Sequence, residues 1–110
     1  MMYTQKGIYE YCLANPLHVN VCVGDLEDLN GEDYIFIDFL SEDLIGYDNR
    51  GTYETELQIT IATKDFDHRR ILTRYIQEYM NVSTYYETSY AFEYYLSRNT
   101  ATIILCDDPE

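Results

Sequence analysis

Adjacent acidic side chains come closest, among the residues of this sequence, to the types and spacing that catalysis uses. They form four pairs, Glu27/Asp28, Glu32/Asp33, Glu42/Asp43 and Asp107/Asp108. A hydrolase that works with two carboxylates needs one of them desolvated, because a raised pKa lets that group act as a general acid. Adjacent acids in loops are ordinarily solvated, so we expect no catalytic residue and no enzyme activity.

The acidic segment from 25 to 33 also raises the question of a metal site. Its oxygen-bearing side chains include Asp25, Glu27, Asn30 and Asp33. They lack the Asp-x-Asp-x-Asp-Gly spacing and the terminal Glu of a calcium loop. His18 and His68 are fifty residues apart, and neither belongs to a full set of Cys and His ligands with the spacing of a zinc site. We therefore expect no metal and no cofactor.

The three cysteines, Cys12, Cys22 and Cys106, do not indicate redox chemistry. An odd number without paired spacing argues against a disulfide framework. Cys12 and Cys22 stand among apolar residues, and Cys106 follows an apolar run. We expect three buried, reduced thiols in a cytosolic protein.

The charge balance is strongly acidic. Twenty Asp and Glu residues against seven Lys and Arg residues give a net charge of −13. Direct binding of nucleic-acid phosphates needs a basic face, so the charge argues against it. Three interpretations stay open: a solvated acidic surface, a protein partner with basic patches, or a mimic of DNA that occupies a DNA-binding protein.

Length and hydrophobicity predict one folded domain over residues 1–110, with a short acidic tail over 106–110. A chain of 110 residues, 46% of them hydrophobic, has material for one core and no room for two. No apolar run approaches the roughly 18 residues of a membrane span. The first residues lack the apolar core of a signal peptide.

The segment from Tyr53 to Thr63 gives the clearest strand signal. Apolar and polar residues alternate along it with a period of two, which places them on opposite faces of a strand. We expect the odd-numbered residues to face the core. The even-numbered residues, Thr60 among them, should then tolerate polar substitution much better than Ile59.

A helix is predicted directly after this strand, ending near Met80. Its apolar face has the spacing i, i+3, i+4 and i+7, carried by Leu72, Tyr75, Ile76 and Tyr79. Asp65 or Asp67 can cap it, since a short carboxylate accepts hydrogen bonds from the first free N–H groups of a helix.

The remaining elements are shorter. We expect a helix over Thr4–Ala14 capped by Thr4, strands over Val19–Val23, Tyr34–Leu40, Tyr86–Leu96 and Thr100–Leu105, and a turn at Arg98-Asn99. The strand Tyr34–Leu40 is apolar on both faces, which is typical of a central strand. The predicted fold class is α/β (α+β), a small, mostly antiparallel sheet of about four to five strands with a long helix and a short N-terminal helix packed on it.

Two biased stretches suggest surfaces for protein contacts. His68, Arg69, Arg70 and Arg74 concentrate positive charge on the first half of the long helix. Thirteen tyrosines without a tryptophan are unusual, and Tyr85, Tyr90 and Tyr95 belong to a cluster of them. The alternatives are pairing with acids of the same chain for the basic stretch, and packing on the long helix for the tyrosines.

The order of these elements resembles the tail-terminator and tail-completion proteins of long-tailed phages, which include small head–tail joining proteins. The resemblance is carried by Tyr34-Ile35-Phe36-Ile37, by Tyr53 to Thr63 (YETELQITIAT) and by Lys64 to Met80 (KDFDHRRILTRYIQEYM), within residues 4 to 105. It lies in the pattern of elements and not in a signature motif. The tyrosine-rich block from 85 to 95 is not a feature that the family shares.

The resemblance implies a structural virion protein without enzyme activity, assembled in the host cytoplasm as a hexameric ring at the end of the tail tube. Its partners would be other copies of the chain, tail tube proteins and head-connector proteins. Acidic loops over 25–33 and 42–50, with Asp28, Asp43 and Asp48, would contact tube or head proteins. Arg69, Arg70, Arg74 and the tyrosines would contact neighbouring copies.

A second hypothesis comes from the charge alone. A small acidic protein with scattered acid pairs is also typical of a DNA mimic, such as an anti-restriction or anti-CRISPR factor that binds a host nucleic-acid-binding protein. A mimic needs carboxylates spaced like phosphates along one surface. The regular strand and helix patterns favour the assembly protein.

Overall fold

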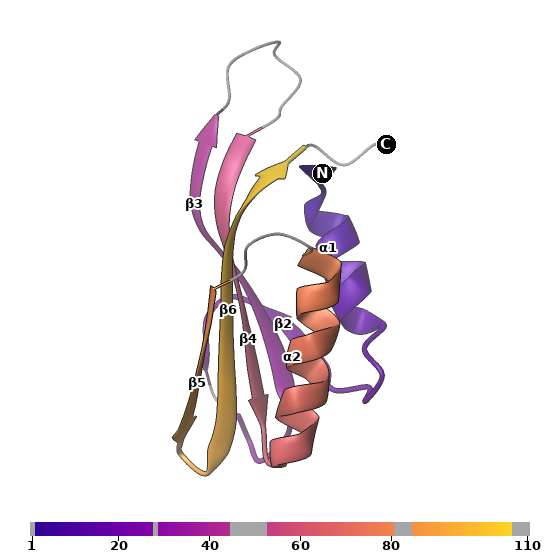
Figure 1. Ribbon diagram of the computed structural model, residues 1–110, viewed down its shortest axis with the longest axis vertical. Helices are drawn as coiled ribbons and strands as arrows, with labels where there is room; N and C mark the ends of the chain where they lie inside the picture. Colours follow the sequence, from indigo (N-terminus) through magenta and orange to yellow (C-terminus); the bar gives the residue numbers. More distant parts are fainter. Residues whose placement is uncertain (1, 28, 45–52, 81–84, 107–110) are drawn as a thin grey trace.

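The computed structural model describes residues 2–27, 29–44, 53–80 and 85–106 (Figure 1). The elements follow in the order β1 (Met2–Tyr3), α1 (Gln5–Leu13), β2 (Asn20–Val23), β3 (Tyr34–Leu44), β4 (Tyr53–Thr63), α2 (Phe66–Met80), β5 (Tyr85–Ala91) and β6 (Tyr94–Leu105). The predicted bounds of β4 and the predicted end of α2 are confirmed.

The strands form a sheet in the order β1-β6-β4-β3-β2, and β5 pairs with β6 beside that path. The long pairs β3–β4, β4–β6 and β5–β6 are antiparallel, while the short pairs β1–β6 and β2–β3 are parallel. Both helices lie on the same face (Figure 1). The α+β class and the mostly antiparallel sheet are confirmed, with β1 as a strand that the sequence pattern did not indicate.

The main core lies between this sheet and the two helices. β4 pairs along its whole length with β6 and along most of it with β3, which makes it central. Its residues Leu57, Ile59 and Ile61 are almost fully buried. They meet Leu72 and Ile76 of α2 in one cluster. The predicted inward face of β4 is therefore confirmed.

The opposite face of β4 is more buried than we expected. Thr60 is 2% exposed and Ala62 is fully buried, because Ala62 packs with Phe36 and Tyr94 in a second, smaller cluster. Leu26 and Leu29, from the segment between β2 and β3, pack against this cluster. Thr60 is therefore not a surface residue, while its better tolerance of a polar substitution than Ile59 stays a prediction. One end of the otherwise open face carries its own small core.

Both helices begin at the expected caps. The Thr4 hydroxyl accepts from the Gly7 N–H at 2.9 Å, and the Asp65 carboxylate accepts from the N–H groups of Asp67 and His68 at 2.8 and 3.2 Å. Each bond satisfies an N–H group that has no partner within its helix. Of the two predicted caps of α2, Asp65 is the one that acts.

The C-terminal third differs from the sequence prediction. The chain turns at Phe92-Glu93, and β6 runs without a break through Arg98 and Asn99, so the predicted turn at Arg98-Asn99 is wrong. Asn99 is fully buried, and its amide donates to the Ile59 carbonyl oxygen at 3.2 Å. The sequence indicates a turn at this position because Asn is common in turns, but the Asn99 side chain makes a hydrogen bond inside the core.

Two smaller expectations also change. β3 continues past Leu40 to Leu44, with an irregularity between Phe39 and Ser41, because β4 offers it partners as far as Tyr53. Cys12 is buried, but Cys22 and Cys106 are only half-buried, and all three thiols are free. The expectation of three buried thiols therefore holds for Cys12 alone.

Candidate partner interface

A groove of about 260 Å³ lies between α2 and β5. Its helical wall contains three arginines, and its other wall comes from the strand. The lining residues are Phe66, Arg69, Arg70, Thr73, Arg74, Gln77, Tyr86 and Thr88. Three of the chain's seven Lys and Arg residues thus line one hollow of a protein with a net charge of −13. We call this hollow the arginine groove.

The periodicity of α2 explains the placement of the arginines. Leu72, Ile76 and Met80 point into the core and are fully buried. With about 3.6 residues per turn, positions 70 and 74 fall off that stripe, whereas position 69, three residues before Leu72, lies on it in the first turn. Arg70 and Arg74 are exposed and Arg69 is half-buried, and all three line the side of the helix that borders β5.

Arg69 is held in place within the chain. Its guanidinium lies over the Phe66 ring, 4.9 Å from the centroid, and 5.6 Å from the centroid of Tyr95. It also donates to the Ser89 carbonyl oxygen at 3.5 Å. Arginine over aromatic faces is a favourable arrangement. Arg69 therefore joins α2 to the β5–β6 hairpin.

Arg70 and Arg74 are much less engaged. Arg70 lies 3.7 Å from the Asp67 carboxylate, with the two side chains 75% and 71% exposed. Such a surface pair contributes about 0 to 1 kcal/mol. Within the described ranges, no ion pair involves Arg74, and a further hollow of about 280 Å³ is lined by Arg70 and Arg74. Both guanidinium groups can therefore take an external anion.

The strand wall presents aromatic surface. Tyr86 and Tyr90 are 49% and 60% exposed, and Tyr90 packs on Tyr95 with ring centroids 4.9 Å apart. Tyr86 and Tyr90 lie opposite Asn99 and Tyr95 in the β5–β6 register. Since residues two apart share a face of a strand, Thr88 lies on this side with them. This confirms that tyrosines of the cluster are exposed.

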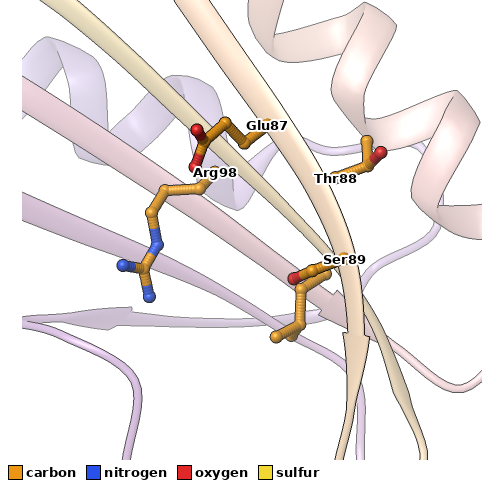
Figure 2. A pocket seen from close by; sticks show the side chains of 5 residues that line it. Glu87, Thr88, Ser89 and Arg98 are labelled. Carbon is orange, nitrogen blue, oxygen red and sulfur yellow. The ribbon is translucent and has the colours of Figure 1, made fainter.

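The other face of the same hairpin carries a second hollow of about 460 Å³ (Figure 2). Figure 2 shows Glu87 and Arg98 on one side of β5 and Thr88 on the other, toward the helix. Glu87 stands opposite Arg98 in the register, and Arg98 also lies 4.0 Å from the Asp25 carboxylate. Its lining carries one acidic and one basic side chain, Glu87 and Arg98, so this hollow lacks the positive excess of the arginine groove.

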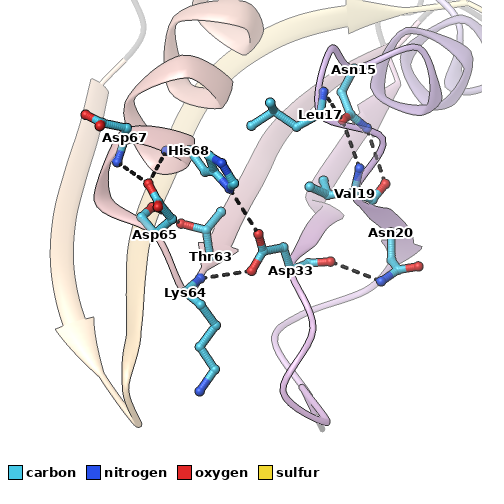
Figure 3. Close-up of polar contacts among 10 residues, drawn as sticks. All are labelled: Asn15, Leu17, Val19, Asn20, Asp33, Thr63, Lys64, Asp65, Asp67 and His68. Carbon is cyan, nitrogen blue, oxygen red and sulfur yellow. Dashed lines mark hydrogen bonds and ion pairs between the residues drawn. The ribbon is translucent and has the colours of Figure 1, made fainter.

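His68, the fourth member of the basic stretch, is turned away from the arginine groove. Its Nδ1 lies 3.5 Å from Asp33, which also accepts from the Lys64 N–H at 2.9 Å (Figure 3). Figure 3 also shows Asn15 bonded to the backbone of Leu17 and Val19. Asp33 and Asn15 thus fix the ends of β3 and α1 and take no part in the groove.

The predicted interface residues divide into two groups. Arg69, Arg70, Arg74, Tyr90 and Tyr95 come together around the arginine groove, and Tyr85 is the first residue of β5. Of the three predicted acids, the structure places only Asp43. Asp28 and Asp48, with most of the segment 42–50 and the tail 107–110, lie outside the described residues; Asp43 stands opposite Glu54 in the β3–β4 register.

Phe66 and Tyr86 line the groove, although the sequence did not single them out as interface residues. A signal for both was present. Phe66 stands three residues before Arg69, where helical neighbours meet. Tyr86 shares the period of two with Thr88 and Tyr90.

Polar groups lie beneath the groove. The Thr73 hydroxyl is 2.8 Å from the Ser97 hydroxyl and 2.7 Å from the Arg69 carbonyl oxygen. Asn99, next on the same face of β6, leaves its side-chain oxygen buried without a hydrogen-bond partner. The region where α2 faces β5 and β6 is thus less apolar than the main core.

Possible metal ligands and the Cys12 thiol are the remaining reactive groups in the described part of the chain. Among these residues, no group of three or more His, Cys, Asp or Glu side chains could hold a metal ion. Burial raises the pKa of the Cys12 thiol to about 12, so it stays protonated and unreactive at neutral pH. None of the described helices combines the length and apolarity needed to span a bilayer.

Neither a protein-family model nor a curated protein sequence matches this chain. The features that bear on function are therefore the arginine groove, the charge distribution and the resemblance in element order.

Proposed function

We propose that this chain is a structural assembly protein of a long-tailed phage, a tail terminator or head–tail joining protein that forms a ring at the end of the tail tube. The arginine groove carries the proposal. Two weakly engaged guanidinium groups beside exposed tyrosines, on a chain of net charge −13, favour contact with an acidic protein surface.

A neighbouring copy can supply that acidic surface. Glu54 and Glu56 are exposed on the even-numbered side of β4, which is the face of the sheet opposite the helices. The arginine groove opens on the helical side. Contact between two different patches of the same chain is heterologous, and heterologous contacts generate closed rings or filaments. The element order, which resembles that of tail terminators, favours the closed ring.

The first experiment measures self-association. We expect light scattering at several salt concentrations to detect oligomers, and electron microscopy to show rings on purified tail tubes. Charge repulsion between copies is screened over about 10 Å at 0.1 M salt. Association should therefore rise with moderate salt if apolar and tyrosine contacts dominate.

The matched variants are Arg74→Glu in the groove and Arg98→Glu on the opposite face of the hairpin. Both reverse one arginine, so they change the net charge equally. We expect Arg74→Glu to weaken association and Arg98→Glu to change it much less. A protein that stays monomeric at every salt concentration and never caps a tube would contradict the proposal.

A DNA mimic is the second candidate, and one observation favours it. Glu54 and Glu56 are two residues apart on one exposed strand face, so their carboxylates repeat at roughly 6.8 Å. Regular negative charge of this kind can occupy a DNA-binding surface. Binding to a host nuclease in competition with DNA, abolished by Glu54→Gln with Glu56→Gln, would favour the mimic over the assembly protein.

A further inference from the structure

We infer that the arginine groove takes an extended acidic segment of a partner protein, added as a strand to the outer edge of β5, with carboxylates at alternate positions. The inference rests on the proposed function, in which the chain meets other virion proteins. It gives the arginine groove an occupant other than the Glu54 and Glu56 surface of a neighbouring copy, because β4 is already paired on both sides and cannot be added to β5. It does not depend on closure of a ring.

The backbone of β5 is available for pairing on one side. β5 pairs with β6 through the register from Tyr85↔Thr100 to Ala91↔Tyr94. Across the ranges that the structure describes, no strand pairs with its other edge. An edge strand presents N–H and C=O groups that an extended peptide can bind, and the main-chain bonds then supply affinity without regard to sequence.

The arginines of α2 beside that edge favour a peptide that carries negative charge. Arg70 and Arg74 are four residues apart on α2, a rise of about 6 Å along the helix. Side chains on one face of a strand repeat every two residues, or roughly 6.8 Å. The two spacings nearly match. A strand lying beside β5 and roughly along α2 can therefore place successive same-face carboxylates near Arg70 and Arg74.

The groove also suits the shape of such a segment. Tyr86 and Tyr90 stand four residues apart on the groove side of β5, with Thr88 between them, so they are spaced by two periods of the same-face carboxylates. Their exposed rings can cover the methylene groups of Glu side chains. Arg69, held by Phe66 and Tyr95, keeps the helical wall in position.

The overall charge favours a short acidic peptide over a nucleic acid. A nucleic acid brings a continuous line of phosphates, which the net charge of −13 repels along its length. A peptide with a few carboxylates is repelled less. The planar guanidinium also binds a carboxylate through two parallel hydrogen bonds.

The test uses two labelled peptides of the same composition and fluorescence anisotropy. In the first, Thr and Glu alternate (TETETET); in the second, the three Glu residues are contiguous (TTEEETT). We expect the alternating peptide to bind about tenfold more tightly, which corresponds to about 1.4 kcal/mol. Methylation of alternate backbone nitrogens of this peptide should abolish binding, and binding of the unmodified peptide should slow amide hydrogen exchange in β5.

The variant Arg70→Gln/Arg74→Gln should lose at least tenfold in affinity for the alternating peptide, with Arg98→Gln as the control that leaves it unchanged. The neutral replacement avoids new repulsion with Asp67, and circular dichroism confirms the fold. Equal binding of both peptides, tighter binding of a thymidine oligonucleotide, or no binding at millimolar peptide would each overturn the inference. Arginine-dependent ring formation without peptide binding would leave the proposed function standing.

Discussion

The face of the sheet beneath α1 and α2 and the open face are built from alternating residues of the same strands, and they differ in what covers them. The covered face packs Leu57, Ile59 and Ile61 of β4 against α2. Among the residues that the structure describes, the open face is covered at one end, where Phe36, Ala62 and Tyr94 meet the segment before β3. Elsewhere on β4 it presents Glu54 and Glu56 to solvent. The covered face therefore contains the main hydrophobic core, whereas the open face accommodates charged side chains over part of its length.

The largest loss of stability is expected from a charge placed on the covered face. We expect Ile59→Asp to lower the free energy of unfolding by about 4 kcal/mol or more, because an unpaired carboxylate would lie where the native side chain is fully buried. Chemical denaturation measures the loss. A loss below about 1 kcal/mol would mean that this position is not part of the core.

Alkaline pH should charge the same core without a mutation, through Cys12 of α1. Burial raises the pKa of the Cys12 thiol from 9.0 to about 12, so the unfolded chain loses this proton first. Between these values the folded state binds more protons, and its stability must fall as pH rises. The Tyr11 hydroxyl, whose pKa burial raises to about 12, acts in the same direction.

The expected loss from Cys12 is roughly 2 to 3 kcal/mol between pH 9 and 11.5, at about 1.4 kcal/mol per pKa unit. Urea denaturation at pH 8, 10 and 11 measures it. Cys12→Ala should show a shallower decline over this range, whatever it costs at pH 8. Identical declines in the two proteins would show that the thiol ionises freely in the folded state.

The open face should respond less to charge. Thr60 is buried, but it lies opposite Arg98 in the β4–β6 register, and Arg98 is exposed. We expect Thr60→Asp to cost about 1 to 2 kcal/mol, less than Ile59→Asp, because Arg98 can pair with the new carboxylate. The loss should grow when Arg98→Ala is added. If Thr60→Asp costs as much as Ile59→Asp, the two faces are equally intolerant.

The smallest effect on stability is expected in the arginine groove. Arg70→Gln or Arg74→Gln should change the free energy of unfolding by less than about 0.5 kcal/mol, since both side chains are exposed and the Arg70–Asp67 pair is a surface pair. Thermal denaturation provides the measurement. Arg69→Gln should cost more, because Arg69 stacks on Phe66. Equal losses at all three positions would mean that Arg69 is no more tightly held by the fold than Arg70 and Arg74.

The elements that the sequence predicted well are those in which one periodicity runs unbroken. β4 alternates along its whole length and α2 keeps an apolar stripe, so local pattern and tertiary packing agree. The arginine groove was predictable in part, since Arg69, Arg70 and Arg74 are close in the sequence. Its other wall depends on the pairing of β5 with β6, which no local pattern specifies.

The hairpin turn shows why the rest could not be predicted. Phe92 and Glu93 adopt positive φ angles of 53° and 66°, a conformation that tight hairpin turns require and that Gly or Asn adopts most readily. Neither residue signals a turn. Arg98-Asn99 resembles one because Asn is common in turns, yet Asn99 serves a buried hydrogen bond. β1 was missed because two residues carry no period.

The pairing of β1 with β6 affects how the protein would respond to mechanical force. Met2 and Tyr3 run parallel to Ile104 and Leu105, and the Cys106 N–H donates to the Tyr3 carbonyl oxygen at 2.8 Å. Tension applied at residues 2 and 106 would pull these strands in opposite directions along their length. Their hydrogen bonds would then be sheared together and not opened one at a time. The short β1–β6 pair would therefore bear a stretching force first, before the long antiparallel pairs of the sheet.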